Sequence, residues 1–518
     1  MTSTSENNKR IAKNTILLYF RMGITMAVQL YTSRVVLDVL GIEDYGIWSL
    51  VATLVVSISF FTGPLLSSTQ RFISYEIGKG NENRVQIIFS QSMILFLIFS
   101  VILAIIFETL GLWLLNTKLS IPPEKVRITN IVYQLAVLTF IVTLIRMSYD
   151  ALIIAYEKML FYAYICLIDV GLKLGIVYVL YLKPQIPTLI LYGILMFLVS
   201  VIITLIYKIY CNHFYRNSKI KFKINRPIIK EMASFSGWSL MGAFAVMTAN
   251  QGVSMVLNVF YGVTINATMG ITNQIGNAVN QFATNFQVAF QPQIVKLYSQ
   301  QDLKNLYLLI YRTSRMSFLL LFAIAYPIIS NINEILLIWL GKDVPILTSE
   351  FCIWLIISLL IDCISAPLWI AIQAVGRIRN YQIIISSIIL LNILVSYILL
   401  YKGLPPVTVM ILKCAVSILC LTTRLQFCKK QINFSFVEYL KKVLSPIILT
   451  VLSSLVIIFP FTNLTISNTL AKLIFHLALF LFAYIPAVYI FGIKSSERIA
   501  IKHFIRAKIH QKQTTNEN

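Results

Sequence analysis

Long apolar segments recur along the whole chain, separated mostly by short polar connections. A bilayer-spanning helix needs about 20 mostly apolar residues, and the pattern predicts about fourteen such spans. Because the apolar runs are continuous rather than alternating, they predict an all-α polytopic membrane protein and exclude a membrane β-barrel. The predicted spans are 14–40, 45–66, 86–115, 128–156, 159–182, 187–210, 233–261, 264–291, 305–332, 350–374, 381–401, 405–427, 443–461 and 468–492.

The two halves of the chain resemble each other. Residues 36–40 (VLDVL) match residues 256–260 (VLNVF), and a glycine follows each segment. Six spans per repeat is an even number, so the halves share one orientation. This predicts two six-helix lobes related by a pseudo-two-fold axis along the membrane normal, with a site between them. The predicted divisions are a first lobe at 1–210, a basic linker at 211–232, a second lobe at 233–428, and a segment at 429–518 with an amphipathic stretch, two extra spans and a basic tail.

The positive charge is distributed in a way typical of membrane topology. The net charge is +23, but the densest clusters of Lys and Arg fall in the N-terminal segment, 211–232, 424–442 and the tail, which the predicted spans place on one side. This asymmetry follows the positive-inside rule and predicts that both termini are cytoplasmic. It favours contact with anionic membrane lipid over a nucleic-acid partner. The seven cysteines fit neither a zinc site nor a disulfide framework, so no metal or cofactor is expected.

Five segments carry a resemblance to a known family. They are 33–48 (SRVVLDVLGIEDYGIW), 70–81 (QRFISYEIGKGN), 235–238 (FSGW), 285–294 (NFQVAFQPQI) and 376–381 (GRIRNY). In this order, the chain resembles the bacterial polysaccharide-export branch of the multidrug/oligosaccharidyl-lipid/polysaccharide (MOP) flippase superfamily, which includes the O-antigen flippases.

The resemblance implies a MATE-like fold, with two lobes in a V around a central cavity. It also implies a flippase, not an enzyme, which moves polyprenyl-diphosphate-linked oligosaccharide from the inner to the outer leaflet of the bacterial cytoplasmic membrane by alternating access. The cargo would be an O-antigen, capsule or exopolysaccharide repeat unit, and a glycan polymerase or chain-length regulator of the same pathway would be a partner. One cavity cation, Arg34, carries over on a family motif.

Ionisable groups within the spans are candidate site residues, because burying a charge in lipid is costly unless it faces a partner or a wet cavity. Candidate cations for the diphosphate are Arg21, Arg34, Arg146, Lys173, Arg312, Arg315 and Lys413, and candidate acids for proton or ion coupling are Asp150, Asp169 and Asp362. Arg146/Asp150 and Asp169/Lys173 are each four residues apart, on one helix face. In each set, either the two charges only neutralise each other, or the Arg or Lys also binds a substrate phosphate. Arg312 and Arg315 either face the cavity or extend to the interface.

A polar stripe marks the eighth span. Its members recur at intervals of three and four residues, which is one face of a helix. That face is either polar glue between helices or a cavity wall that hydrogen-bonds sugar hydroxyls. The stripe consists of Asn273, Asn277, Asn280, Thr284 and Gln287.

Two other functions compete with the flippase. A small-molecule or multidrug cation-coupled antiporter of the same superfamily would favour an acidic site, but the spans hold more bases than acids. A membrane enzyme such as a glycan polymerase would need a large outward loop, and the predicted outward loops are short. The sequence therefore favours an anionic cargo.

Overall fold

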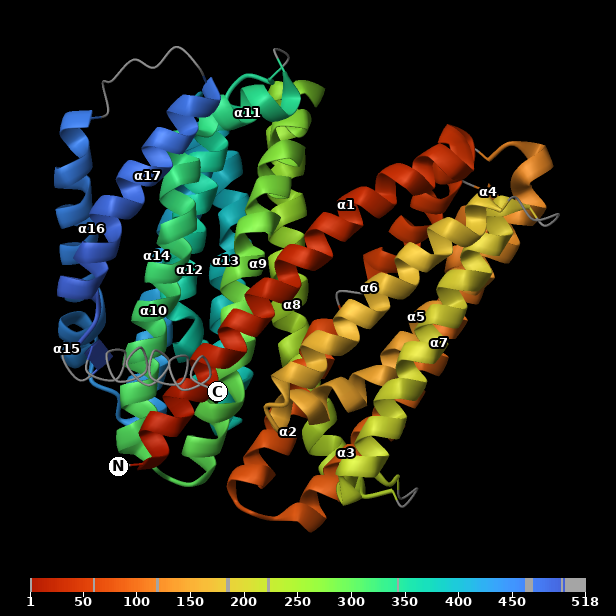
Figure 1. The fold of residues 1–518 in the computed structure, drawn as a ribbon, viewed down its shortest axis with the longest axis horizontal. Helices are drawn as coiled ribbons and strands as arrows, with labels where there is room; N and C mark the ends of the chain where they lie inside the picture. Colours follow the sequence, from red (N-terminus) through yellow and green to blue (C-terminus); the bar gives the residue numbers. More distant parts are fainter. Residues whose placement is uncertain are drawn as a thin grey trace, which may run out of the picture.

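The structure is a computed structural model that describes residues 2–58, 61–117, 121–182, 187–220, 224–341, 344–461, 469–494 and 497–498. Within these ranges the regular elements are all helices. They form two lobes that meet at one end and diverge at the other, in the V seen in Figure 1. The all-α prediction is therefore confirmed.

The first lobe contains seven labelled helices. α1 is long because it includes two arms joined at Gly41, where the backbone leaves the helical region. In Figure 1, the first arm rises diagonally across the molecule and the chain then returns toward α2. The helices are α1 (Thr2–Ile58), α2 (Thr62–Gly78), α3 (Glu82–Ile106), α4 (Leu112–Thr117), α5 (Val126–Ala155), α6 (Met159–Tyr181) and α7 (Thr188–Phe214).

The second lobe follows the same plan, and the C-terminal helices pack against its α10. Its helices are α8 (Arg226–Tyr261), α9 (Val263–Ser299), α10 (Leu303–Ser330), α11 (Ile332–Leu340), α12 (Thr348–Val375), α13 (Arg379–Tyr401) and α14 (Val407–Ile432). The C-terminal helices are α15 (Phe436–Tyr439), α16 (Ser445–Ile458) and α17 (Thr469–Ala487).

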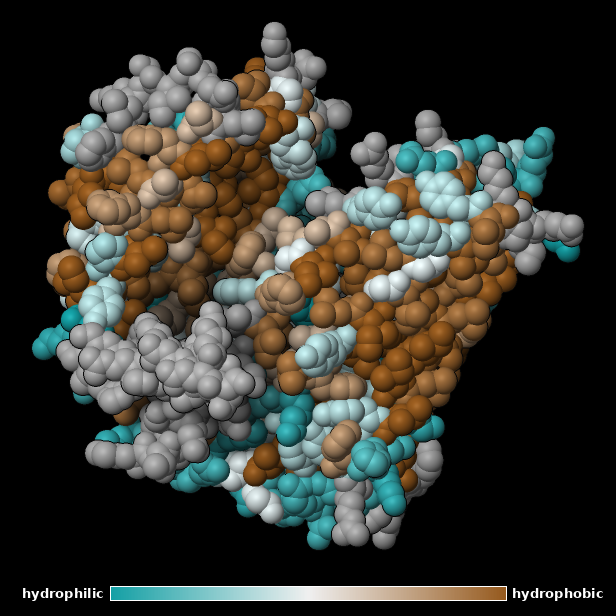
Figure 2. All heavy atoms as spheres, in the orientation of Figure 1, coloured by the Kyte–Doolittle hydropathy of each residue, from teal (hydrophilic) through white to brown (hydrophobic). Residues whose placement is uncertain are grey.

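Eleven helical segments in the described ranges are long and apolar enough to cross a membrane. The two arms of α1 and the polar helix α9 lie where the other three spans were predicted. Figure 2 shows a broad apolar band on the outer faces of both lobes, with hydrophilic residues gathered at the end where the lobes meet. An apolar belt of this kind is what a lipid-facing surface requires.

Three helices extend past the ends of their predicted spans, all at the end where the lobes meet. The predicted second span ends at residue 66, but α2 continues to Gly78. The helix persists because Phe72 and Ile73 are buried in the core, where Phe72 stacks edge-to-face on Phe235 of the other lobe. Helix α9 likewise runs on to Ser299, and α14 to Ile432.

The repeat is visible in the backbone of three connections. At corresponding points of the two halves, each connection has a residue with positive φ. Residues other than Gly rarely adopt this conformation. The pairs are Gly41 (φ 78°) with Gly262 (φ 71°), Gly80 (φ 70°) with Gln301 (φ 59°), and Glu157 (φ 59°) with Gly376 (φ 89°). These shared conformations support the predicted duplication more strongly than the weak identity between the halves.

Candidate functional site

A pocket of about 800 Å³ lies between the lobes, and α1, α6, α7 and α9 line it. One wall carries charged side chains from α1 and α6, and the opposite wall carries hydroxyl and amide groups from α9. Figure 2 shows the lobes hollowed apart at their diverging end. The polar and aromatic lining residues include Arg21, Thr25, Gln29, Thr32, Tyr45, Trp48, Asp169, Lys173, Tyr192, Gln281, Thr284 and Asn285.

Arg21 connects the two walls of this pocket. Its Nη2 donates to Oδ1 of Asn285 on α9 at 2.8 Å, and its Nη1 contacts Sγ of Cys166 on α6 at 3.4 Å. The guanidinium also lies 4.8 Å from the ring centre of Tyr162. Its buried Nε has no hydrogen-bond partner. Because sulfur is a weak acceptor, this guanidinium retains hydrogen-bonding capacity for an anionic ligand.

Lys173 and Asp169 form the predicted pair on α6. Nζ of Lys173 lies 2.7 Å from Oδ2 of Asp169, and the lysine side chain is 39% exposed. Both residues line the pocket. The pair therefore neutralises itself in this conformation, while the ammonium stays accessible to a ligand.

Arg146 and Asp150 also pair, but they lie in the first lobe outside the set of residues that line the pocket. Nε of Arg146 is 3.6 Å from Oδ2 of Asp150, and its guanidinium lies 5.6 Å from the ring centre of Tyr207. The structure therefore gives this pair partners within its own lobe.

The polar stripe of α9 faces open space over much of its length. Thr284 lines the pocket beside Gln281 and Asn285, two amides of the stripe that were not among the predicted site residues. Asn273 lines a second pocket of about 600 Å³ between α8 and α9. Asn277 and Asn280 are exposed between these two points, and Gln287 is half-buried. Exposed side chains suit a cavity wall better than polar glue.

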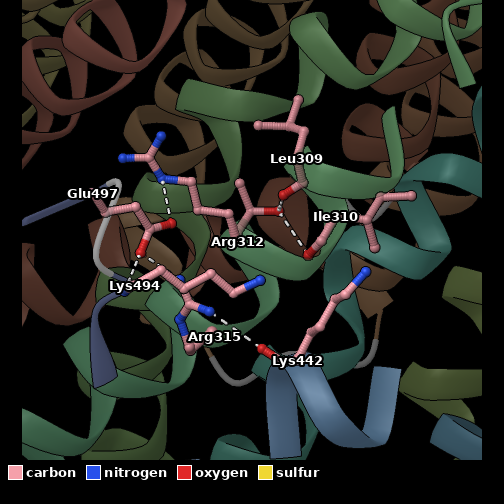
Figure 3. Close-up of polar contacts among 8 residues, drawn as sticks. Leu309, Ile310, Arg312, Arg315, Lys442, Lys494 and Glu497 are labelled. Atoms are coloured by element: carbon pink, nitrogen blue, oxygen red, sulfur yellow. Dashed lines mark hydrogen bonds and ion pairs between the residues drawn. The ribbon is translucent and has the colours of Figure 1, made fainter. Parts of the chain in front are cut away.

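Two of the predicted cavity cations lie elsewhere. Arg312 and Arg315 on α10 both pair with Glu497, at 3.3 Å and 2.5 Å respectively, as Figure 3 shows. Arg315 is 1% exposed and also donates to the carbonyl oxygen of Lys442. Burial, followed by the charges of Arg315 and Lys442, lowers the pKa of nearby Lys494. We therefore assign these two arginines to anchoring the C-terminal segment rather than to the cavity.

The remaining cations divide between the lobes. Nζ of Lys413 on α14 lies 3.3 Å from Oδ1 of Asn250 on α8. The carboxylate of Asp362 on α12 is near enough to attract the charge of Lys413. Arg424 was expected in a cytoplasmic loop, but it lies within α14, where it contacts Ser365 and donates to the hydroxyl of Tyr381 at 3.1 Å. The side chain of Arg34 lies outside the described part of the structure. Within the described ranges, no group of three or more His, Cys, Asp or Glu could hold a metal ion.

The contacts that hold the lobes together were not predicted from the sequence. Nζ of Lys296 on α9 lies 2.7 Å from Oε1 of Glu157, whose side chain is fully buried at the α5–α6 turn. In the opposite direction, Arg71 on α2 donates to the carbonyl oxygens of Gln373 and Ala374, at 3.2 Å and 3.0 Å. Polar segments that look like loops in the sequence thus form the seal. We call this sealed region the closed end.

Solved transporters share this architecture. A crystal structure of MATE in complex with MaD3S is 15% identical with a TM-score of 0.68, over 81% of this chain and 96% of that one. An outward-facing multidrug resistance MATE family transporter of the MOP superfamily is 14% identical with a TM-score of 0.66, over 84% and 96%. The chain has the MATE fold.

A third structure with the MATE fold is a MOP superfamily transporter from Pyrococcus furiosus, described as having a binding pocket of reverse polarity that suggests a different function. It is 15% identical with a TM-score of 0.64, over 82% of this chain and 96% of that one. No protein family and no curated protein matches the chain by sequence. The evidence for the MATE fold is therefore structural.

Proposed function

We propose that the chain is a flippase for polyprenyl-diphosphate-linked oligosaccharide, the repeat unit of an O-antigen, capsule or exopolysaccharide. The observation that carries the proposal is that Arg21 and Lys173 share one interlobe pocket with Gln281, Thr284 and Asn285 of α9. Such a cargo has an anionic diphosphate and many neutral hydroxyls. The pocket offers a cationic wall for the first and an amide wall for the second.

Arg21 is suited to the diphosphate. A guanidinium binds two phosphate oxygens in parallel, and a phosphate oxygen is a far better acceptor than the Cys166 sulfur that Arg21 now contacts. Lys173 adds a second positive charge once its bond to Asp169 is shared with the ligand. We also propose Arg34 as a further cation for the diphosphate and Asp150 and Asp362 as groups for proton or ion coupling. Arg146 and Lys413 would balance the charges of these two acids.

The sugars would extend along the stripe of α9. From Thr284 in the main pocket, the exposed amides continue through Asn280 and Asn277 to Asn273 in the second pocket. Amide groups both donate and accept hydrogen bonds, as sugar hydroxyls do. A run of such groups holds a glycan of variable composition, while the polyprenyl tail stays in the lipid between the lobes.

The closed end defines the state of the transport cycle. It carries the described parts of the basic segments (Figure 1), and the positive-inside rule places these segments and both termini in the cytoplasm. The lobes are then sealed on the cytoplasmic side of the inner membrane and diverge on the outer side. Rocking of the lobes about the pocket would open the seal and admit the next cargo from the inner leaflet. The reverse movement would close the seal and release the cargo on the outer side. A glycan polymerase or chain-length regulator would take the released cargo.

A small-molecule antiporter is the second candidate, since the solved relatives include a multidrug transporter and Tyr45, Trp48 and Tyr192 give the pocket aromatic surfaces. A cationic drug would require an unneutralised acid in the pocket. Asp169 is held by Lys173 at 2.7 Å, so the geometry favours the anionic cargo.

The proposal is tested by deleting the gene and extracting the lipids. We expect a polyprenyl-diphosphate oligosaccharide to accumulate in the inner leaflet, protected from an external glycosidase in intact spheroplasts, while surface glycan disappears. Reintroducing the gene restores export, and a Lys173→Gln variant expressed at the same level restores it poorly. The deletion strain could instead make normal surface glycan, accumulate no lipid-linked intermediate and become sensitive to cationic drugs. That result would contradict the flippase and favour the antiporter.

A further inference from the structure

A second basic pocket, of about 360 Å³, lies at the closed end and is separate from the cavity described above. Helix α2 of the first lobe forms one side, and the start of α8 with the α12–α13 turn of the second lobe forms the other. Three of the five family-like segments meet in it, although their residues contribute nothing to the central cavity. The lining residues that matter are Arg71, Glu231, Phe235, Trp238, Arg377 and Arg379.

Three guanidinium groups line this pocket against one carboxylate, that of Glu231. Arg71 is 6% exposed, whereas Arg377 and Arg379 are exposed at the rim. The guanidinium of Arg379 lies 5.4 Å from the ring centre of Trp238, and that of Arg71 lies 5.4 Å from Phe235. Stacking on aromatic rings orients a guanidinium while leaving its N–H edge available. The pocket therefore has a net positive charge and two aromatic surfaces.

Arg71 joins the pocket to the seal between the lobes. Its Nε and Nη2 donate to the carbonyl oxygens of Gln373 and Ala374 at the end of α12. Gly376 lines the pocket directly beside this guanidinium. An anion in the pocket would compete with the two carbonyls for Arg71, because a hydrogen bond to a charged oxygen is stronger than one to a neutral carbonyl.

We propose that this pocket is a docking site for the phosphate group of an anionic amphiphile, on the side from which a cargo would be loaded. This rests on the proposed function and deepens it: the diphosphate first binds Arg377 and Arg379 at the rim, then draws Arg71 from the end of α12 and loosens the seal. The aromatic side chains accept the first isoprene units or the adjoining sugar. A phospholipid headgroup has the same phosphate chemistry and is the other source of the occupant.

The test measures binding of farnesyl diphosphate to the full-length protein in nanodiscs of neutral phosphatidylcholine, with farnesol as the uncharged control. An Arg21→Gln background removes the cavity cation that would add a second diphosphate site. The Arg377→Gln/Arg379→Gln variant is compared with Lys429→Gln/Lys430→Gln, which removes two exposed charges from the end of α14 outside the pocket. Both changes lower the general positive charge equally.

We expect the dissociation constant to rise about tenfold or more in the arginine variant, the effect of losing charge-assisted hydrogen bonds, and to change less than about twofold in the lysine variant. Equal weakening in both variants, or none in the arginine variant, would overturn the docking site. If phosphatidylglycerol in the nanodisc displaces farnesyl diphosphate, the natural occupant is a phospholipid. If it does not, the occupant is an isoprenyl diphosphate.

The two proposals fail separately. Unchanged binding in the arginine variant removes the docking site but leaves export of glycan in cells as evidence for the flippase. Normal glycan export in the deletion strain removes the flippase but leaves the phosphate site measured in nanodiscs.

Discussion

Glu157 and Gly376 occupy corresponding turns in the two halves of the chain, and a basic residue from the opposite lobe holds each turn. Lys296 of α9 pairs with the Glu157 carboxylate. Arg71 of α2 donates to the two backbone carbonyls that lie just before Gly376. The pseudo-symmetry of the fold thus provides two contacts between the lobes at equivalent places. One is an ion pair, and the other is a set of hydrogen bonds from Arg71 to the C-terminal end of a helix. Both must break when the closed end opens.

Glu157→Gln should make opening of this end easier. The Glu157 side chain is fully buried, and breaking a buried ion pair by removing one charge costs about 3–5 kcal/mol. We expect a membrane-impermeant maleimide applied from the closed end to label a Ser67→Cys reporter on α2 about tenfold faster or more. Adding Lys296→Met should increase labelling little further, because the two residues act as one contact. Additive effects would show that the pair is not the seal.

Gly376→Ala should destabilise the protein for two separable reasons. Gly376 has a φ of 89°, which is unfavourable for alanine, and an added Cβ would collide with the guanidinium of Arg71. Gly403→Ala is the matched control, since Gly403 has a φ of 79° with nothing within 4 Å of an added Cβ. We expect the control to lose about 1 kcal/mol and Gly376→Ala to lose clearly more, measured as unfolding midpoints in detergent. Equal losses would mean that Arg71 moves aside freely.

The sequence predicts the all-α fold, and it marks three of the charged residues that line the candidate pocket. Continuous apolar runs specify the spans, and Arg21, Asp169 and Lys173 lie within those runs, so their charges alone mark them. Arg312 carries the same signal, but its partner Glu497 is far away in the sequence, and no local pattern reveals it. Arg71 looks like a loop residue because a polar segment that seals two lobes has the same sequence pattern as a polar segment exposed to water. Its place depends on tertiary packing.

Glu497→Gln should weaken the attachment of the C-terminal segment without abolishing export. Arg315 is 1% exposed, so removing the carboxylate leaves a buried guanidinium without its counter-charge. We expect a loss of about 3 kcal/mol or more, seen as a lower unfolding midpoint. Replacing Arg312 and Arg315 by Met in the same variant should recover part of that stability, because apolar side chains need no counter-charge. No recovery would show that the loss comes from something other than the uncompensated charge of the two arginines.

Arg21 should be needed for its geometry as well as for its charge. Its guanidinium spans the pocket between Asn285 and Cys166, and lysine cannot reproduce two parallel bonds to a phosphate. We therefore expect Arg21→Lys to reduce glycan export about tenfold, and Arg21→Gln to reduce it more, at equal expression. Arg312→Lys is the matched control, since Arg312 pairs with Glu497 outside the pocket and should leave export unchanged. If both lysine variants export equally, the pocket needs only the positive charge, and the bidentate contact with the diphosphate is excluded.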